Sequence, residues 1–276
     1  MNKKGQEFFS IIIFFAFAVL LFMITNKYTG KQADINLDYI GKNQAGIKQI
    51  YEKAENDMFF IDLLAKYASW NAFYKLAGRG GFKDLSCKQP YTGYCLIDPK
   101  NFTEYRENFK TLFHDNFDNI FKIYFGKLLN YTVTIKDNLV VGIATDVLAY
   151  GKTINKGFVN YTIKPHFEVQ MEYSFSDYEN IKRNSLILIQ KCAGNENLTE
   201  CIGDEIKNFK ETDLIWQPNE CGKEITPIQN NKVAFCVFHK PVKTIYTKEG
   251  LKPLLYQFSL DFTSSTTEQR EQQSLA

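Results

Sequence analysis

Three histidines, His114, His166 and His239, are the side chains of this sequence best suited to ligate a catalytic metal or to move a proton. Each lies on a different expected element, and none forms the His-x-x-x-His or His-Glu-x-x-His spacing that puts two zinc ligands on one helix face. The sequence also lacks the Gly-x-Ser-x-Gly turn that presents a serine nucleophile. The spacing favours structural or surface roles for these histidines, and we expect no metal or cofactor.

Pairs of acidic residues could supply a general acid and a general base. The pairs are Asp115 with Asp118, Glu104 with Glu107, and Asp204 with Glu205, all among Lys, Asn and Phe on expected helices. That setting is typical of a solvated face. A glycosidase needs two carboxyl groups whose different surroundings push their pKa values apart. None of these pairs has such surroundings. We therefore predict that the protein is not an enzyme.

Six cysteines could bind zinc, act as nucleophiles or form disulfides. They are Cys87, Cys95, Cys192, Cys201, Cys221 and Cys236. No two have the Cys-x-x-Cys spacing of a zinc knuckle, and an even number of them, all after residue 86, indicates disulfides in an oxidising exterior. Gaps of eight, nine and fifteen residues suit three local bridges, although six cysteines allow fifteen pairings.

Four Asn-x-Thr triplets support the same exterior location. They begin at Asn101, Asn130, Asn160 and Asn197, all in the cysteine-bearing part of the chain or close to it. Such triplets are acceptors for N-glycosylation in exported proteins. We expect these asparagines to be exposed and available to modification.

The elements that would position these residues begin with a long amphipathic helix. Apolar residues recur at three- and four-residue steps from Ile47 to Leu76, and Gly78 ends the pattern. A second helix is predicted from Phe102 to Leu129. The further predictions are a hairpin at 131–135 and 139–145, strands at 158–163 and 166–175, helices at 176–192 and 199–209, and strands at 232–238 and 254–262.

This pattern predicts an α+β domain in which long amphipathic helices pack on an antiparallel sheet and disulfides staple the loops. Ser176 is expected to cap its helix, because Glu179 follows at the third position of a capping box. The formal net charge is +2, from 33 basic and 31 acidic residues, so no basic surface for nucleic acid is indicated. Residues 264–276 are polar and read as a disordered tail.

The N-terminus carries the clearest single signal in the sequence. Lys3 and Lys4 lead into Phe8–Ile24, seventeen residues with one hydroxyl and no charge, about 25 Å of helix and enough for a short bilayer span. Ala16-Phe17-Ala18 has the form of a signal-peptidase site, but the apolar run continues beyond it, which favours a retained anchor. With the cysteines and sequons outside, the N-terminus is predicted to be cytoplasmic.

The segment Lys3-Lys4-Gly5-Gln6 directly before an apolar helix resembles the class III signal peptide of archaeal type IV pilin-like proteins. The resemblance implies that a prepilin peptidase cuts after Gly5, that Gln6 becomes the first residue, and that the apolar helix is kept. The glutamate usual at the fifth mature position of pilins is Ser10 here, and the nearest acid is Glu7. The remainder of the chain more loosely resembles membrane-anchored archaeal proteins with a cysteine-bearing α+β exterior domain.

We therefore predict an anchor at 1–25, a juxtamembrane spacer at 26–46, an extracytoplasmic α+β domain at 47–263 and the tail. The predicted function is a non-enzymatic surface component of the cell membrane, either a minor pilin or pseudopilin-like subunit with pilin partners, or a tethered module that binds at the cell surface. In the binding version, exposed tyrosines and the Cys87–Cys95 loop would make the contact. The alternative is a membrane-anchored hydrolase of envelope polymer, with the three histidines as its residues.

Overall fold

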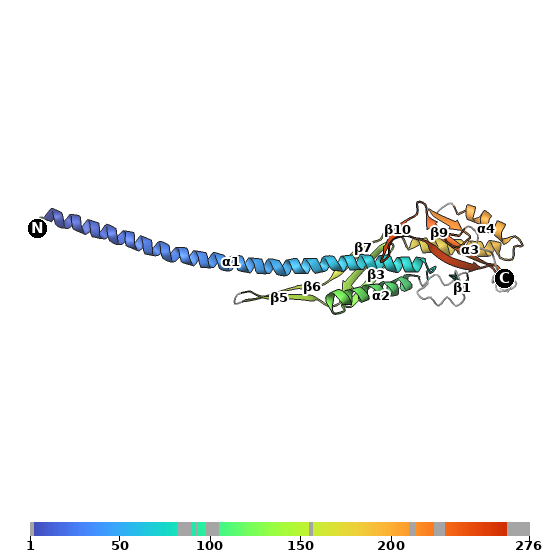
Figure 1. Ribbon diagram of the computed structural model, residues 1–276, viewed down its shortest axis with the longest axis horizontal. Coiled ribbons are helices and arrows are strands. Elements are labelled where there is room, and N and C mark those ends of the chain that lie inside the picture. The colour runs from blue at the N-terminus through green and yellow to red at the C-terminus, as the bar shows by residue number, and fades with distance from the viewer. Residues whose placement is uncertain are drawn as a thin grey trace, which may run out of the picture. The chain divides into compact units, whose positions relative to one another are not determined.

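The computed structural model describes residues 3–81, 90–91, 93–97, 105–154, 157–209, 213–223 and 230–263 (Figure 1). Before residue 40, side chains are described only at 17–24 and 27. The chain divides into two compact units, one of Met1–Asp57 with Leu148–Ile163 and one of Met58–Val147 with Lys164–Ala276. The boundary between the units therefore falls inside a helix, whereas the sequence placed one domain from residue 47 onward. The predicted tail lies outside the described residues.

Helix α1 (Lys3–Ala77) is continuous over 75 residues. The spacer expected at 26–46 is helical throughout, although it contains Gly30, Gly41 and Gly46. A glycine costs a helix only about 1 kcal/mol, and helical residues on both sides propagate through it. At Gly46 the absence of a side chain is useful, since a Cβ there would clash with the side chain of Ile154.

The predicted membrane span lies at the start of α1. Its side chains are described from Phe17 onward, and most of those up to Ile24 are large, apolar and exposed. Among the residues that the structure describes, no helix combines the length and the apolarity needed to cross a bilayer.

In the first unit, an antiparallel hairpin packs on α1. Its strands are β5 (Leu148–Ile154) and β6 (Gly157–Ile163). Tyr150 donates from its hydroxyl to Asp57 Oδ2 at 2.9 Å, and Tyr51 meets the ring of Tyr161 edge-on. Strand β5 was not predicted, whereas β6 matches the strand predicted at 158–163. The partner of β6 is β5 and not the strand that follows it in the sequence.

In the second unit, helix α2 (Tyr105–Phe125) covers a three-stranded antiparallel sheet. The sheet order is β3 (Tyr131–Lys136), β4 (Leu139–Ala144) and β7 (His166–Gln170), which confirms the predicted hairpin at 131–145. Phe113 and Phe117 of α2 contact the ring of Phe167 on β7. The helix stops before the predicted Leu129, because Gly126 follows in a left-handed conformation with φ 66°.

A five-stranded sheet forms the rest of the second unit, in the order β1-β2-β12-β9-β8. The bounds are β1 Pro90–Tyr91, β2 Tyr94–Ile97, β8 Leu214–Gln217, β9 Lys232–His239 and β12 Tyr256–Asp261. The prediction of a purely antiparallel sheet is wrong at one place, since β12 runs parallel to β2. Alternating apolar residues identify a strand but do not encode the direction of its neighbour. The small hairpin of β10 (Thr244–Thr247) and β11 (Gly250–Pro253) was not predicted.

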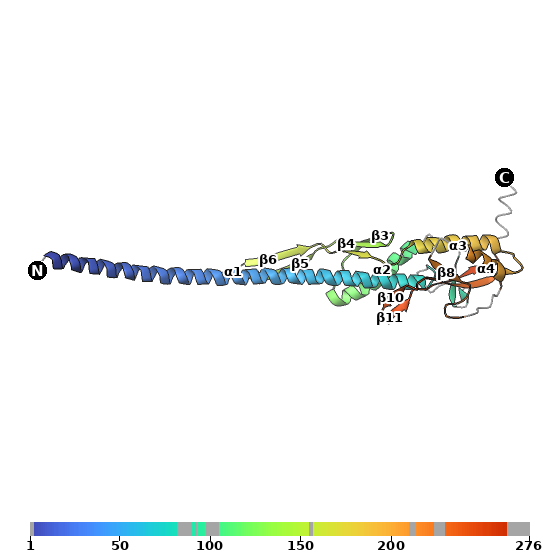
Figure 2. The same ribbon diagram turned by 90° about the horizontal axis from the view of Figure 1, so that it is seen from above.

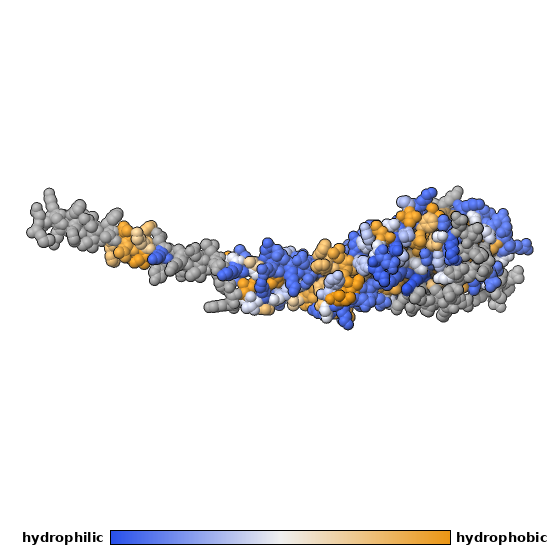
Figure 3. All heavy atoms as spheres, viewed as in Figure 1, coloured by the Kyte–Doolittle hydropathy of each residue, from blue (hydrophilic) through white to orange (hydrophobic). Residues whose placement is uncertain are grey.

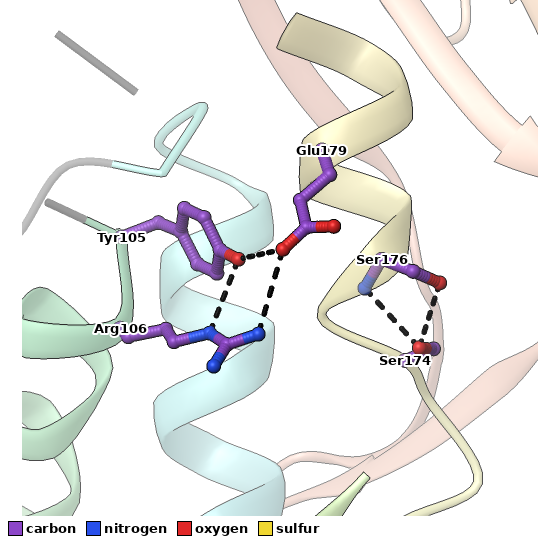
Figure 4. Close-up of polar contacts among 5 residues, drawn as sticks. All are labelled: Tyr105, Arg106, Ser174, Ser176 and Glu179. Carbon is purple, nitrogen blue, oxygen red and sulfur yellow. Dashed lines mark hydrogen bonds and ion pairs between the residues drawn. The ribbon is translucent and has the colours of Figure 1, made fainter. Parts of the chain in front are cut away.

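Helices α3 (Ser176–Cys192) and α4 (Leu198–Lys207) lie beside this sheet (Figure 2). The predicted capping box is wrong, because Ser176 is already the first helical residue and the N-cap residue Phe175 has no side-chain cap. Ser174 Oγ accepts from the Ser176 amide at 3.1 Å, and Glu179 points to other partners (Figure 4). The start of α4 is capped as physical rules expect, with the Asn197 side chain accepting from the Glu200 amide.

Two disulfides join neighbouring cysteines in the sequence, Cys192 with Cys201 and Cys221 with Cys236. Both local pairings were predicted from spacing. Cys95 is also disulfide-bonded, and its predicted partner Cys87 lies outside the described residues.

Replacing both cysteines of a disulfide by alanine is expected to destabilise the second unit. The free energy of unfolding should fall by roughly 2.5 kcal/mol without the Cys192–Cys201 bridge and by roughly 3 kcal/mol without the Cys221–Cys236 bridge. The second loss is larger because that bridge closes the longer loop. Chemical denaturation of each double variant, with and without a reductant, measures the loss. A double variant that is as stable as wild type in the absence of reductant would contradict the expected loss for that bridge.

Phe73 of α1 lies at the centre of the second unit's aromatic core. Its ring is fully buried and contacts rings from four other segments. These contacts are with Phe109 at 6.5 Å, Tyr173 and Phe175 at 5.4 Å each, Tyr178 at 5.6 Å and Tyr256 at 6.4 Å between centroids. One side chain thus joins α1, α2, α3 and the five-stranded sheet.

Candidate functional site

A buried polar cluster connects α3 to the five-stranded sheet. Asp177 Oδ2 lies 2.9 Å from His239 Nε2 and accepts a hydrogen bond of 2.7 Å from the Tyr256 hydroxyl. A carboxylate only accepts, so His239 carries a proton on Nε2. Since all three side chains are buried, the cluster fixes α3 on the sheet and has no described opening to a substrate.

The other two histidines lie away from this cluster. His114 is on α2 near Asp118, and the exposed His166 begins β7 near Asp62. Within the described residues, no group of three His, Cys, Asp or Glu side chains could hold a metal ion. The structure therefore gives each histidine a different acidic neighbour and does not bring the three together.

A groove of about 670 Å³ lies between the first turn of α2 and the outer face of α3. It is the candidate binding site, and its volume is within the range of small-ligand pockets. The lining residues are Tyr105, Arg106, Glu179, Lys182, Arg183, Leu186, Ile187 and Gln190. Leu186 and Ile187 are half-buried and supply the apolar part.

Polar contacts across one end of this groove hold its two helices in register (Figure 4). The Tyr105 hydroxyl donates to Glu179 Oε1 at 2.8 Å, and Arg106 Nε donates to the Tyr105 hydroxyl at 3.2 Å. Arg106 Nη2 lies 3.4 Å from the same Glu179 oxygen. Burial, and then the hydrogen bond to Glu179, raise the pKa of Tyr105, so this hydroxyl stays a donor at neutral pH.

The groove has more positive than negative charge. Arg106, Lys182 and Arg183 face a single acid, Glu179, and Glu179 is already engaged by Arg106. The arrangement can bind a molecule that combines an anionic group with an apolar part. Binding such a molecule is the chemistry that these charged and apolar side chains support.

Other predicted site residues are on the surface or outside the described set. Asn130, Asn160 and Asn197 are exposed, as acceptor asparagines must be. Asn101 and Cys87 lie outside the described residues. The residues of the predicted processing site, Lys3, Lys4, Gly5 and Gln6, are in α1, and their side chains lie outside the described set.

Sequence reasoning missed the roles of two acids on α3. Asp177 and Glu179 read as first-turn acids that favour a helix dipole, yet one is a buried acceptor and the other links α3 to α2. No local pattern distinguishes these roles, because both partners of each acid are 60 to 80 residues away in the sequence.

Buried tyrosines around the cluster predict loss of stability at alkaline pH. Burial raises the pKa of Tyr173 to about 12 and those of Tyr178 and Tyr256 well above the usual value. An unfolded tyrosine releases its proton near pH 10, while these folded tyrosines keep theirs. The unfolded state therefore binds fewer protons above pH 10, and the free energy of unfolding should fall as pH rises from 10 toward 12.

Thermal unfolding at pH 8, 9.5 and 11 measures this effect. The melting temperature should be lowest at pH 11, and Tyr173→Phe should reduce the fall, since it removes one of the titrating groups. A melting temperature that is equal at pH 9.5 and 11 would contradict the prediction.

No protein-family model, no curated protein and no solved structure matches this chain. What the groove binds must therefore follow from its own residues and their geometry.

Proposed function

We propose that this chain is a membrane-anchored, extracytoplasmic and non-enzymatic surface component whose second unit binds a ligand or partner. Three features support the proposal. The apolar segment Phe8–Ile24 lies near the start of a helix of 75 residues, the disulfides lie after it in the sequence, and the groove between α2 and α3 is lined by residues suited to binding. The groove is the single observation that favours the tethered binding module.

In the pilin version of the proposal, the N-terminal residues carry the function. Lys3 and Lys4 would flank the site recognised by prepilin peptidase, Gly5 and Gln6 would border the cut bond, and Phe8–Ile24 would serve as anchor and later as filament core. A glutamate is absent from the fifth mature position, where Ser10 stands. For this reason we place the binding module first and the pilin or pseudopilin-like subunit second.

Intact mass and N-terminal peptide mapping of the protein from its native membrane test the anchor. The measurement is made with and without reduction and deglycosylation. A chain that begins at Met1 or Asn2 supports a static anchor and the binding module, and a chain that begins at Gln6 supports the pilin version. A terminus near Val19 would overturn the retained anchor.

Charge complementarity predicts the class of ligand for the groove. Lys182 and Arg183 should attract an anionic group while Leu186 and Ile187 contact an apolar one. Phenyl phosphate is a suitable probe, and benzyl alcohol is its uncharged counterpart. Titration calorimetry on the full chain should detect the first and give weaker or no heat with the second.

Removing one cation from the groove should weaken that binding. Lys182→Ala is expected to raise the Kd for phenyl phosphate about fivefold, because an exposed charge contact is worth up to about 1 kcal/mol. Lys136→Ala, which removes an exposed lysine of β3, is the matched control. Equal effects of the two substitutions would show that the probe binds through general charge and not in the groove.

A further inference from the structure

The outer face of α1 in the second unit carries a row of large side chains. Phe59, Leu63, Lys66 and Trp70 follow at steps of three and four residues, so they lie on one side of the helix. At Trp70 the chain covers this face itself, because the indole stacks on Tyr246 of β10 with centroids 5.5 Å apart. At Phe59 and Leu63 the face is exposed.

The uncovered part continues onto the last turn of α2. Phe60 stacks on Tyr124 with centroids 6.4 Å apart and also meets Phe59 edge-on. Ile123 directly precedes Tyr124 in the sequence and is exposed as well. We call these five residues, Phe59, Phe60, Leu63, Ile123 and Tyr124, the helix patch. Their exposed fractions run from 46% for Leu63 to 80% for Ile123. Figure 3 shows apolar surface gathered over this part of α1 and the end of α2.

The patch is large for a surface that stays in water. Its three aromatic side chains alone expose about 350 Å², taking about 200 Å² for each, and with Leu63 and Ile123 the area is roughly 550 Å², at the upper end of the largest patch on a typical monomer. Two such patches face to face would bury about 1,100 Å², close to the lower limit of a specific interface before any polar rim is added.

We propose that the helix patch binds the same patch of a second copy of this chain. The five side chains carry no charge, and interfaces between identical subunits are more apolar than those between transient partners. A two-fold axis places the same surface on both sides, so apolar area meets apolar area without a complementary charge pattern. This contact goes beyond the proposed function and uses neither the groove nor the anchor.

Site-specific cross-linking in the native membrane tests the contact. Ile123→Cys adds a thiol to the patch, and a bis-maleimide should then join two copies into a covalent dimer on a denaturing gel. Ile143→Cys is the matched control, because Ile143 is an isoleucine of β4 that is 48% exposed and lies outside the patch. We expect at least a tenfold higher dimer yield from Ile123→Cys than from Ile143→Cys.

A second variant shows whether the patch itself causes the association. Adding Phe59→Asp to Ile123→Cys should reduce the dimer yield at least tenfold, since it puts a charge into an apolar contact while changing a side chain that is exposed in the single chain. An unchanged melting temperature confirms that the variant is folded. Equal yields at positions 123 and 143, a yield unaffected by Phe59→Asp, or cross-linking only to a different protein would each overturn the proposal.

Discussion

Asp177→Ala is expected to lower the free energy of unfolding of the second unit by about 3–5 kcal/mol, the range for breaking a buried polar pair by removing one partner. The substitution leaves His239 Nε2 and the Tyr256 hydroxyl without their shared acceptor. Both groups are buried, so water cannot replace the carboxylate, and each unsatisfied donor costs roughly 1–3 kcal/mol. Urea denaturation followed by the fluorescence of Trp70 and Trp216 measures the loss.

Asp177→Asn separates the hydrogen bonds from the charge. The amide keeps one oxygen acceptor of nearly the same shape, so the loss should be smaller than for alanine, about 1–3 kcal/mol. Glu179→Ala is a control on the same helix, because Glu179 is exposed and its contacts lie at the groove. If Asp177→Ala and Glu179→Ala cost the same, the buried cluster does not stabilise the fold.

Phe73→Ala should lower the free energy of unfolding of the second unit by a similar amount, through lost packing alone. A fully buried phenylalanine leaves a cavity that costs about 3–5 kcal/mol, and five aromatic neighbours around Phe73 cannot easily collapse into the space. The same denaturation measurement applies. Because Phe73 joins four segments, the variant should also show a less cooperative transition.

Phe59→Ala is the control for this prediction. It makes the same substitution on the same helix at a side chain that is 60% exposed, so the loss should be about 0.5 kcal/mol or less. A loss at Phe59 as large as at Phe73 would mean that the exposed face of α1, and not the aromatic core, carries the stability of this helix.

Local signals in the sequence predicted most of the secondary structure. Alternation of apolar residues located the β3–β4 hairpin, helical spacing located α2, and the short gaps between cysteines indicated two disulfides that the structure contains. These features depend on residues close together in the chain, where period and spacing carry the information.

Features that depend on distant residues were not predictable. The parallel pairing of β2 with β12 joins residues such as Leu96 and Ser259, and nothing near either strand specifies the other. The same reason explains the groove, since Tyr105 and Glu179 are 74 positions apart. The expected spacer at 26–46 is part of α1, because the cost of one glycine is small beside that of starting a new helix.

The sheet order also determines when this protein can finish folding. Among the residues that the structure describes, β12 is the last strand in the sequence, but it lies between β2 and β9 in the sheet. While the ribosome is still making the C-terminal residues, both neighbouring strands lack their central partner, and such edges pair readily with other chains. A chain that ends before Tyr256 would keep those edges permanently, so quality control during synthesis should act most strongly on products truncated near the C-terminus.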